Sequence, residues 1–408
     1  MRILHTSDWH LNDRLYWVDR QPDIKNRLQE LAVYLQEHAV DVMVVAGDLF
    51  SQRNSRMEEL QIAISDVSEV FTPFLRRGGT IVAVSGNHDS EALFGLLRSA
   101  QDLAAPIEGD SSCYPPGRMY LATRATRLPL QDRRGERVQF VLLPYPTEHR
   151  YLRGGAVHYT SMEEKHVLLR QSLLHRLFQL KEHHLDVGLP SVLVAHLHVR
   201  SSELHSLYRL SEKEDVLFDL GDLPLHWAYA ALGHIHKAQE VQGLSHMRYS
   251  GSLERMDLAE RADPKSAVLV QIVNGQLVEP PALLPVHATP IHQFEITDPA
   301  REIPALAERF PDSTDALAYY RLHYRPGEHN VKDLCRDIEA HFRHCCKREL
   351  IAEGAPAPAS GAEEEMSPAS QSTPEKVLSY LTARLEGDRD RDEILAIADC
   401  VLAQEVWL

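Results

Sequence analysis

The chain opens with Met1-Arg2-Ile3-Leu4-His5-Thr6-Ser7-Asp8-Trp9-His10-Leu11, an aliphatic run followed at once by an acid and a histidine. Four later segments repeat this arrangement, each carrying Asp, Asn or His directly after a short aliphatic run. They are Gly47-Asp48, Gly86-Asn87-His88-Asp89, Ala195-His196-Leu197-His198 and Gly233-His234-Ile235-His236. Open α/β sheets bind their ligands at the carboxyl ends of the strands. We therefore predict that these segments meet in one polar pocket.

The spacing of apolar residues predicts the fold around this pocket. The first 105 residues alternate between expected strands and expected helices, which is typical of a mostly parallel sheet covered by helices. The runs 119–128 and 137–143 flank a polar turn and predict a β-hairpin. The expected helices are 22–38, 55–76, 91–103 and 162–184. We expect an α/β protein in which two packed sheets are flanked by helices.

The chain is expected to divide into four parts. Residues 1–280 hold all the polar segments, and residues 285–350 predict a small α+β unit with a helix at 330–347. Residues 353–373 are rich in Ala, Pro, Ser and Glu, a composition that predicts a flexible linker. Residues 374–408 carry two amphipathic helices that either fold back or dock on a partner. We favour docking on a partner, because a flexible tether would serve little purpose if the helices folded back.

The amino-acid composition excludes some classes of protein. The chain has 408 residues, 44% of them hydrophobic, and a net charge of −16. Such acidity argues against general coating of polyanions but is compatible with a local basic groove. The 5 cysteines match neither a zinc ribbon nor a disulfide framework. With no signal-peptide pattern and only strand-sized apolar runs, we expect a cytoplasmic protein without membrane contact.

The residue types after the strands suit divalent cations. The candidate metal ligands are Asp8, His10, Asp48, Asn87, His196, His234 and His236. Carboxylate, amide and imidazole donors together fit Mn²⁺ best, with Fe²⁺, Zn²⁺ or Mg²⁺ as alternatives. Two such ions would clamp a phosphodiester and activate a bridging water. Any one of the 23 histidines is more often a surface residue, so the prediction depends on the conjunction of all five segments.

Three further side chains near the ligands receive other roles. His88 stands beside a ligand but is expected to act on the substrate as a catalytic histidine, with Asp89 holding its orientation. His198 follows His196 by two residues, so on a strand both point to the same face. We expect His198 to support a ligand or contact substrate rather than bind metal.

These segments, in this order, resemble the motif set of the calcineurin-like metallophosphoesterases. Residues 1–11, 44–50, 86–90 and 231–236 are similar, more closely, to the SbcD nucleases of bacteria, kin to the meiotic-recombination-eleven nucleases. The resemblance implies a calcineurin-like two-sheet sandwich. It also implies an Mn²⁺-dependent DNA nuclease (3′–5′ double-strand exonuclease and single-strand or hairpin endonuclease) in DNA repair, recombination and replication.

The resemblance also implies roles and partners. One metal would be held by Asp8, His10, Asp48 and His236, and the other by Asp48, Asn87, His196 and His234. Residues 285–350 would form a cap that helps select the DNA strand. Residues 374–408 would grip an SMC-like ABC ATPase of the SbcC type, in a heterotetramer that contains a homodimer of this chain.

The DNA contacts are less specific in the sequence. Arg14, Arg53 and His198 are candidate phosphate contacts, and Tyr16 and Trp17 can pack on sugar or base. Two positions depart from the family pattern without touching a ligand: Ser51 stands where relatives often carry His or Asp, and Asn12 where Gly is common.

Two other functions use the same residues. A small-molecule phosphodiesterase or phosphatase needs the same metals but neither the extra unit nor the tethered helices. An inactive scaffold that recruits an ATPase would show a lost ligand, whereas every ligand position in this chain is filled.

Overall fold

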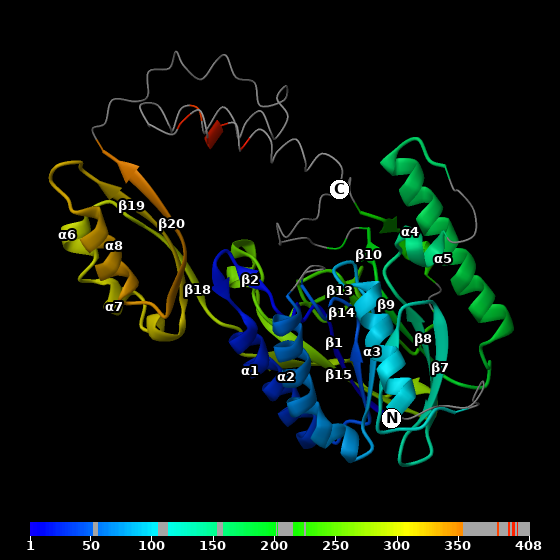
Figure 1. The fold of residues 1–408 in the computed structure, drawn as a ribbon. Coiled ribbons are helices and arrows are strands. Elements are labelled where there is room, and N and C mark those ends of the chain that lie inside the picture. The colour runs from blue at the N-terminus through cyan, green and yellow to red at the C-terminus, as the bar shows by residue number, and fades with distance from the viewer. Residues whose placement is uncertain are drawn as a thin grey trace. The chain divides into compact units, whose positions relative to one another are not determined.

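The computed structural model describes residues 1–51, 56–104, 113–152, 158–200, 202, 215–223 and 226–353, with positions 382, 391, 394, 395 and 398 (Figure 1). Met1–Tyr324 and His329–Ile351 form one compact unit, and Arg325–Glu328 with Ala352–Leu408 form a second. Nearly all of the expected linker and C-terminal helices lie outside the described residues. Within the described ranges, no helix combines the length and apolar character needed to cross a membrane.

The first sheet has seven strands in the order β16-β15-β1-β4-β5-β6, with β17 also paired to β15. Strands β1, β4, β5 and β6 run parallel, and β15 lies antiparallel to β1. The strands are β1 (Arg2–Thr6), β4 (Val42–Val45), β5 (Thr80–Val84), β6 (Met119–Ala122), β15 (Lys265–Val273), β16 (Gln276–Leu277) and β17 (Ala282–Val286).

The second sheet has six strands in the order β13-β14-β12-β9-β8-β7. Its central strands β8, β9, β12 and β14 are parallel. The strands are β7 (Thr126–Gln131), β8 (Arg137–Leu143), β9 (Ser191–His196), β12 (Tyr229–Gly233), β13 (Gln239–Val241) and β14 (Leu244–Tyr249). Short pairs form elsewhere, namely β2 (Arg14–Leu15) with β3 (Val18–Asp19) and β10 (His198–Val199) with β11 (Leu217–Phe218).

The two sheets pack face to face and helices cover their outer faces. Val44 of the first sheet and Phe140 and Val194 of the second belong to one fully buried cluster between them. The first sheet carries α1 (Gln21–Glu37), α2 (Met57–Arg76) and α3 (Glu91–Ala104), and the second carries α5 (Met162–His183), with α4 (Glu148–Tyr151) before it. The predicted sandwich of two sheets flanked by helices is confirmed.

The predicted hairpin is correct in kind but wrong in extent. The run 119–128 is not one strand: β6 ends at Ala122 and pairs with β5, whereas β7 begins at Thr126 and pairs with β8. The chain crosses from the edge of one sheet to the edge of the other between them. The residue pattern does not reveal such a crossing, because each part has strand-like side chains and the connection is only three residues long.

Residues 291–352 form a three-stranded sheet, β18 (Ile291–Ile296), β19 (Leu317–Tyr324) and β20 (His344–Ala352), with α6 (Pro299–Glu302), α7 (Leu306–Arg309) and α8 (Val331–Glu339). The predicted helix at 330–347 is wrong beyond residue 339, and Cys345 and Cys346 lie on β20 rather than on a helix. Both cysteines take part in hydrophobic packing: Cys345 packs against the cluster that contains Ile338, and Cys346 belongs to the cluster that contains Leu317. Pairing with β19 outweighs the helical preference of this run.

Candidate metal centre

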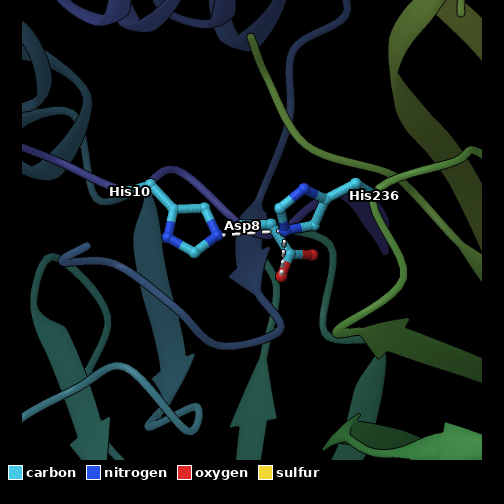
Figure 2. Close-up of side chains that lie close together, drawn as sticks. All are labelled: Asp8, His10 and His236. Carbon is cyan, nitrogen blue, oxygen red and sulfur yellow. Dashed lines mark hydrogen bonds and ion pairs between the residues drawn. The ribbon is translucent and has the colours of Figure 1, made fainter. Parts of the chain in front are cut away.

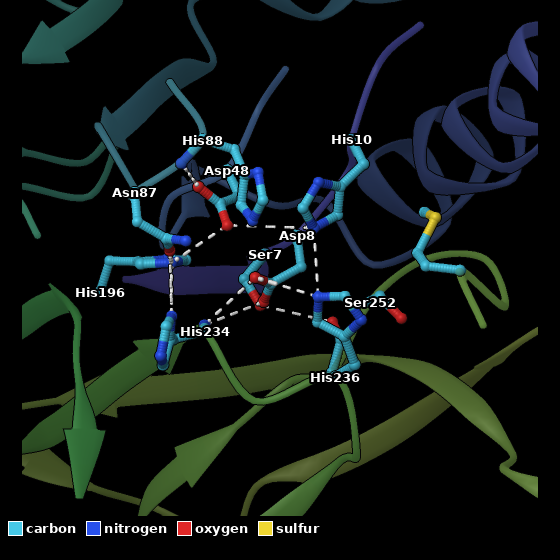
Figure 3. A network of polar contacts seen from close by, with 12 residues as sticks. Ser7, Asp8, His10, Asp48, Asn87, His88, His196, His234, His236 and Ser252 are labelled. Carbon is cyan, nitrogen blue, oxygen red and sulfur yellow. Dashed lines mark hydrogen bonds and ion pairs between the residues drawn. The ribbon is translucent and has the colours of Figure 1, made fainter. Parts of the chain in front are cut away.

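The polar segments follow strands that end near one another. Strands β1, β4 and β5 pair in parallel in the first sheet, and β9 pairs in parallel with β12 in the second. Because the two sheets pack face to face, the segments after these strands converge, as Figure 3 shows. All seven predicted ligand side chains are brought together.

One group consists of Asp8, His10 and His236, all buried (Figure 2). The Nε2 atoms of His10 and His236 lie 3.1 Å apart. His236 Nε2 lies 3.9 Å from Asp8 Oδ1. Two imidazole nitrogens and a carboxylate oxygen thus surround one small space.

A second group lies beside the first and shares a carboxylate with it. Asn87 Oδ1 is 3.0 Å from both His196 Nε2 and His234 Nδ1, and those two nitrogens are 3.2 Å apart. Asp48 Oδ2 is 3.3 Å from His196 Nε2 and 3.9 Å from His10 Nε2. Asp48 therefore stands between the two groups.

In the histidine rings, the nitrogen that points away from the ligand groups makes a hydrogen bond to another residue. His196 Nδ1 donates to the carbonyl of Ala46 over 2.7 Å. His236 Nδ1 lies 2.8 Å from Glu260 Oε1. The carboxylate of Glu260 also accepts a hydrogen bond from Lys265. Although burial opposes ionisation, Lys265 and the contact with His236 hold the pKa of Glu260 well below its usual range. Because Nδ1 of each ring keeps its proton for this contact, a cation that displaces any second proton meets the lone pair at Nε2.

Asp215 holds the third ring in the same way. Its Oδ2 accepts from His234 Nε2 at 2.7 Å and contacts His198 Nδ1 at 2.8 Å, and its Oδ1 accepts from the Tyr145 hydroxyl. His234 consequently presents its lone pair at Nδ1, toward Asn87. Sequence reasoning missed Asp215 and Glu260 because neither stands at a fixed spacing from a ligand.

This arrangement of donors fits bound cations. Imidazole nitrogens that face each other at 3.1–3.2 Å need a positive charge between them, either a shared proton or a metal cation, because two bare lone pairs at this distance repel. Ligand atoms bound to one ion at about 2.1 Å lie roughly 3 Å apart. A partner that accepts from the other ring nitrogen is typical of histidine ligands to metals. The residues therefore fit two divalent cations with Asp48 between them.

The backbone is strained where the ligands stand. Asp8, His10, Asp48 and His234 have positive φ angles of 51°, 47°, 51° and 101°, each of which costs about 1–3 kcal/mol for a side chain of this kind. A Cβ atom at Gly86 would lie 2.0 Å from Asp48 Oδ1, so only glycine admits this close approach. The fold holds these residues in conformations that they would not adopt alone.

Asp89 has a different task from the one expected. Its carboxylate accepts hydrogen bonds from the backbone N–H groups of Leu49, Phe50 and Gly86, at 3.3, 2.9 and 2.8 Å, instead of orienting the His88 ring. Burial and, secondarily, the nearby Asp48 raise the pKa of Asp89 to about 7. Asp89 thus ties together the two loops that carry Asp48 and Asn87.

His88 lies at the edge of the two groups. Its backbone N–H donates to Asp48 Oδ1 over 2.9 Å, and its ring meets the His10 ring edge-on at a centroid distance of 5.1 Å. Burial, reinforced by neighbouring histidines, lowers the pKa of His88 despite the attraction of Asp48. The ring is therefore neutral near pH 7 and has one N–H to donate.

The remaining candidates do not join the two ligand groups directly. Arg14 is half exposed and pairs with Glu59 at 3.3 Å, and Arg53 lies outside the described residues. His198 is only 1% exposed, so its contact with Asp215 fits the supporting role and disfavours direct contact with a substrate. Ser51 is buried and donates to Asp13.

Fold and site together define a phosphoesterase with a two-metal centre. The chain belongs to the calcineurin-like phosphoesterase family, whose model matches residues 1–238. In structure, a dimetal phosphatase from Danio rerio aligns with 67% of this chain and 92% of its own length, at 14% identity and a TM-score of 0.38.

Several curated relatives are all named as the SbcD component of the nuclease SbcCD. The protein of Escherichia coli K12 is 28% identical over 294 residues, covering 68% of this chain and 66% of the relative. That of Bacillus subtilis is 26% identical over 287 residues (68% and 67%), and that of Rhodobacter capsulatus 29% over 288 residues (67% and 67%). The chain thus spans about two thirds of the length of the relatives it matches.

Replacing Asp215 by Asn removes the charge behind His234 without removing a ligand. We expect the affinity for Mn²⁺ to fall about 10- to 100-fold, measured by titration calorimetry. The matched control is Asp219→Asn, an exposed carboxylate paired with Arg170 and Arg200. An unchanged affinity in Asp215→Asn would contradict the role of Asp215.

Metal binding is expected to strengthen as pH rises. Burial disfavours a proton on His196, but Asp48 outweighs burial and raises the pKa of His196 in the metal-free chain to about 9. A cation must displace this proton, so below pH 9 binding releases protons and becomes weaker at lower pH. Calorimetry in buffers of different ionisation enthalpy counts the protons released. Binding without proton release at about pH 7 would disprove the assignment.

Proposed function

We propose that this chain is an Mn²⁺-dependent DNA nuclease that hydrolyses phosphodiester bonds. The observation that carries the proposal is the pair of ligand groups joined by Asp48, with His88 at their edge. The names of the curated relatives support DNA as the substrate. The mixed oxygen and nitrogen donors favour Mn²⁺ over Mg²⁺.

Each residue of the site has a separate role in this proposal. Asp8, His10 and His236 would hold one cation, and Asn87, His196 and His234 would hold the other, with Asp48 shared. When bound, the cations would supply charge neutralisation and an activated water. His88 donates its N–H toward the departing sugar oxygen, and its backbone contact with Asp48 keeps it within reach. Asp89 joins the loops of Asp48 and Asn87 through its hydrogen bonds to their backbone.

An exposed aromatic hairpin supports a nucleic-acid substrate. Tyr16 and Trp17 lie between β2 and β3 with 49% and 59% of their surfaces exposed. Lys347 lies 5.5 Å from the centre of the Tyr16 ring. Aromatic faces beside a cation bind bases and phosphates together. We assign the hairpin to DNA contact, with the small unit 285–350 as the cap beside it.

The assembly is the second part of the proposal. We assign residues 374–408 to binding an SbcC-like ABC ATPase, because the relatives are named as components of the SbcCD nuclease. We assign α2 and α3 to a homodimer contact within that complex. These helices expose Met57, Ile62, Leu96 and Leu103 by 55–86% of their surfaces, and large exposed apolar side chains mark interaction surfaces.

Replacing His88 by Ala should separate chemistry from metal binding. We expect the rate of DNA cleavage to fall about 10²- to 10³-fold, because a hydrogen-bond donor that stabilises charge on the departing oxygen is lost, while Mn²⁺ content by mass spectrometry stays at wild-type level. His175→Ala, an exposed histidine of α5, serves as the control. Undiminished cleavage in His88→Ala would refute its role, and much faster turnover of cyclic nucleotides than of DNA would favour the small-molecule alternative.

A charge placed on the exposed apolar surface of α2 and α3 should separate the dimer. We expect the double variant Ile62→Asp/Leu96→Asp to elute as a monomer in light-scattering chromatography, whereas the unchanged chain elutes as a dimer. Val33→Asp on α1, at a side chain that is 51% exposed, is the matched control. Equal masses for the unchanged chain and the double variant would speak against this contact.

A further inference from the structure

A groove lies away from the metal ligands, between α3 and the edges of both sheets. Its volume is about 570 Å³, within the range typical of ligand clefts. Its lining comes from α3, β6, β7, the end of β8 and α5, of which α3, β7, β8 and α5 are labelled in Figure 1. The seven ligand residues all lie outside this lining.

The groove is strongly basic although the whole chain is acidic. Its arginines are Arg98, Arg118, Arg124, Arg127 and Arg176. Among the described side chains that line it, Asp102 is the one acidic residue, and it lies 3.8 Å from Arg98 and 3.7 Å from Arg118. Among the described residues of the lining, arginines thus outnumber carboxylates by five to one. In a chain of net charge −16, such a cluster focuses a positive potential on one surface.

Aromatic rings stand beside these cations. Tyr114 and Tyr120 pack edge to face with centroids 5.8 Å apart, and the guanidinium of Arg118 lies 5.7 Å from the centre of the Tyr120 ring. The Tyr120 hydroxyl donates to the carbonyl of Pro115, which fixes the ring. Guanidinium groups beside aromatic rings suit a ligand that carries both phosphates and flat bases.

One end of the groove adjoins the loop that carries a metal ligand. Ala122, at the end of β6, lines the groove, and its carbonyl accepts from the backbone N–H of Ser85 at 3.0 Å. Asn87 follows Ser85 by two residues, and Arg124 follows Ala122 by two. The strand that lines the groove therefore ends beside the loop of Asn87.

We propose that this groove binds a single-stranded segment of nucleic acid, through its phosphates at the arginines and its bases on the tyrosines. The inference rests on the proposed nuclease function, because it adds a binding track beside that same centre. The groove favours a strand over a duplex, because stacked and paired bases of a duplex cannot reach the tyrosine rings.

The test compares two double variants that remove the same charge. In Arg98→Gln/Arg124→Gln the groove loses two arginines. In the control, Arg133→Gln/Arg134→Gln, two exposed arginines are lost from the turn between β7 and β8. Binding of a fluorescent oligodeoxythymidylate of about 12 nucleotides, within the usual site size, to the full chain is measured by anisotropy in EDTA, which prevents cleavage. Thermal melting of both variants checks that they fold.

We expect the groove variant to bind roughly tenfold or more weakly at low salt and the control to bind as the unchanged chain does. The slope of log affinity against log salt should become shallower by about 1.4, since each phosphate contact on a single strand contributes about 0.7. Equal weakening in both variants, or none in the groove variant, overturns the proposal. Thymidine monophosphate competing as well as the oligonucleotide, per molecule, overturns it in favour of a free-nucleotide site.

Hydrolysis of bis(p-nitrophenyl) phosphate with Mn²⁺ separates this inference from the proposed function. This small ester needs the metal centre but not the groove, so we expect both double variants to hydrolyse it at the rate of the unchanged chain. Failure of the unchanged chain to hydrolyse it counts against the nuclease assignment. If both double variants bind the oligonucleotide equally weakly and still hydrolyse the ester, the result counts against the groove alone.

Discussion

The hydrogen bonds behind the histidine ligands are the interactions on which this site depends. Because Ala46, Glu260 and Asp215 accept from the outer ring nitrogens of His196, His236 and His234, the inner nitrogens are directed at one another. A cation that displaces the protons shared by these inner nitrogens therefore finds their lone pairs already directed toward it. Burial of apolar side chains in the two packed sheets offsets the free energy needed to bring these residues together, because the same strands carry them.

The same constraint explains the strained backbone and the glycines. Two groups of ligands can share Asp48 only if its loop lies against the loop of Asn87, and the absence of a Cβ at Gly86 permits this approach. Asp89 then binds both loops through backbone N–H groups. Positive φ angles at Asp8 and His10 turn both side chains inward within a few residues of the strand end. Local strain is thus tolerated where it serves the geometry of the centre.

Beyond the centre, the protein distributes charge unevenly. Acidic residues dominate the chain as a whole, yet arginines gather with tyrosines in a groove whose end adjoins the loop of Asn87. Tyr16 and Trp17 form an exposed aromatic hairpin elsewhere on the molecule. An acidic surface with confined basic regions directs a polyanion to chosen places and keeps it from the rest. This pattern agrees with an enzyme that processes a strand rather than one that coats it.

The sandwich and the convergence of the five polar segments, with their seven proposed ligand residues, could be predicted before folding was considered, because strand-end position and residue type are local properties of the chain. Asp215 and Glu260 could not, since a hydrogen bond to the back of a ring joins segments that are distant in sequence. The separation of β6 and β7 into different sheets and the place of Cys345 and Cys346 on a strand were equally hidden. These outcomes depend on which distant strands come within hydrogen-bonding reach of one another, and that is settled by the packing of the whole chain.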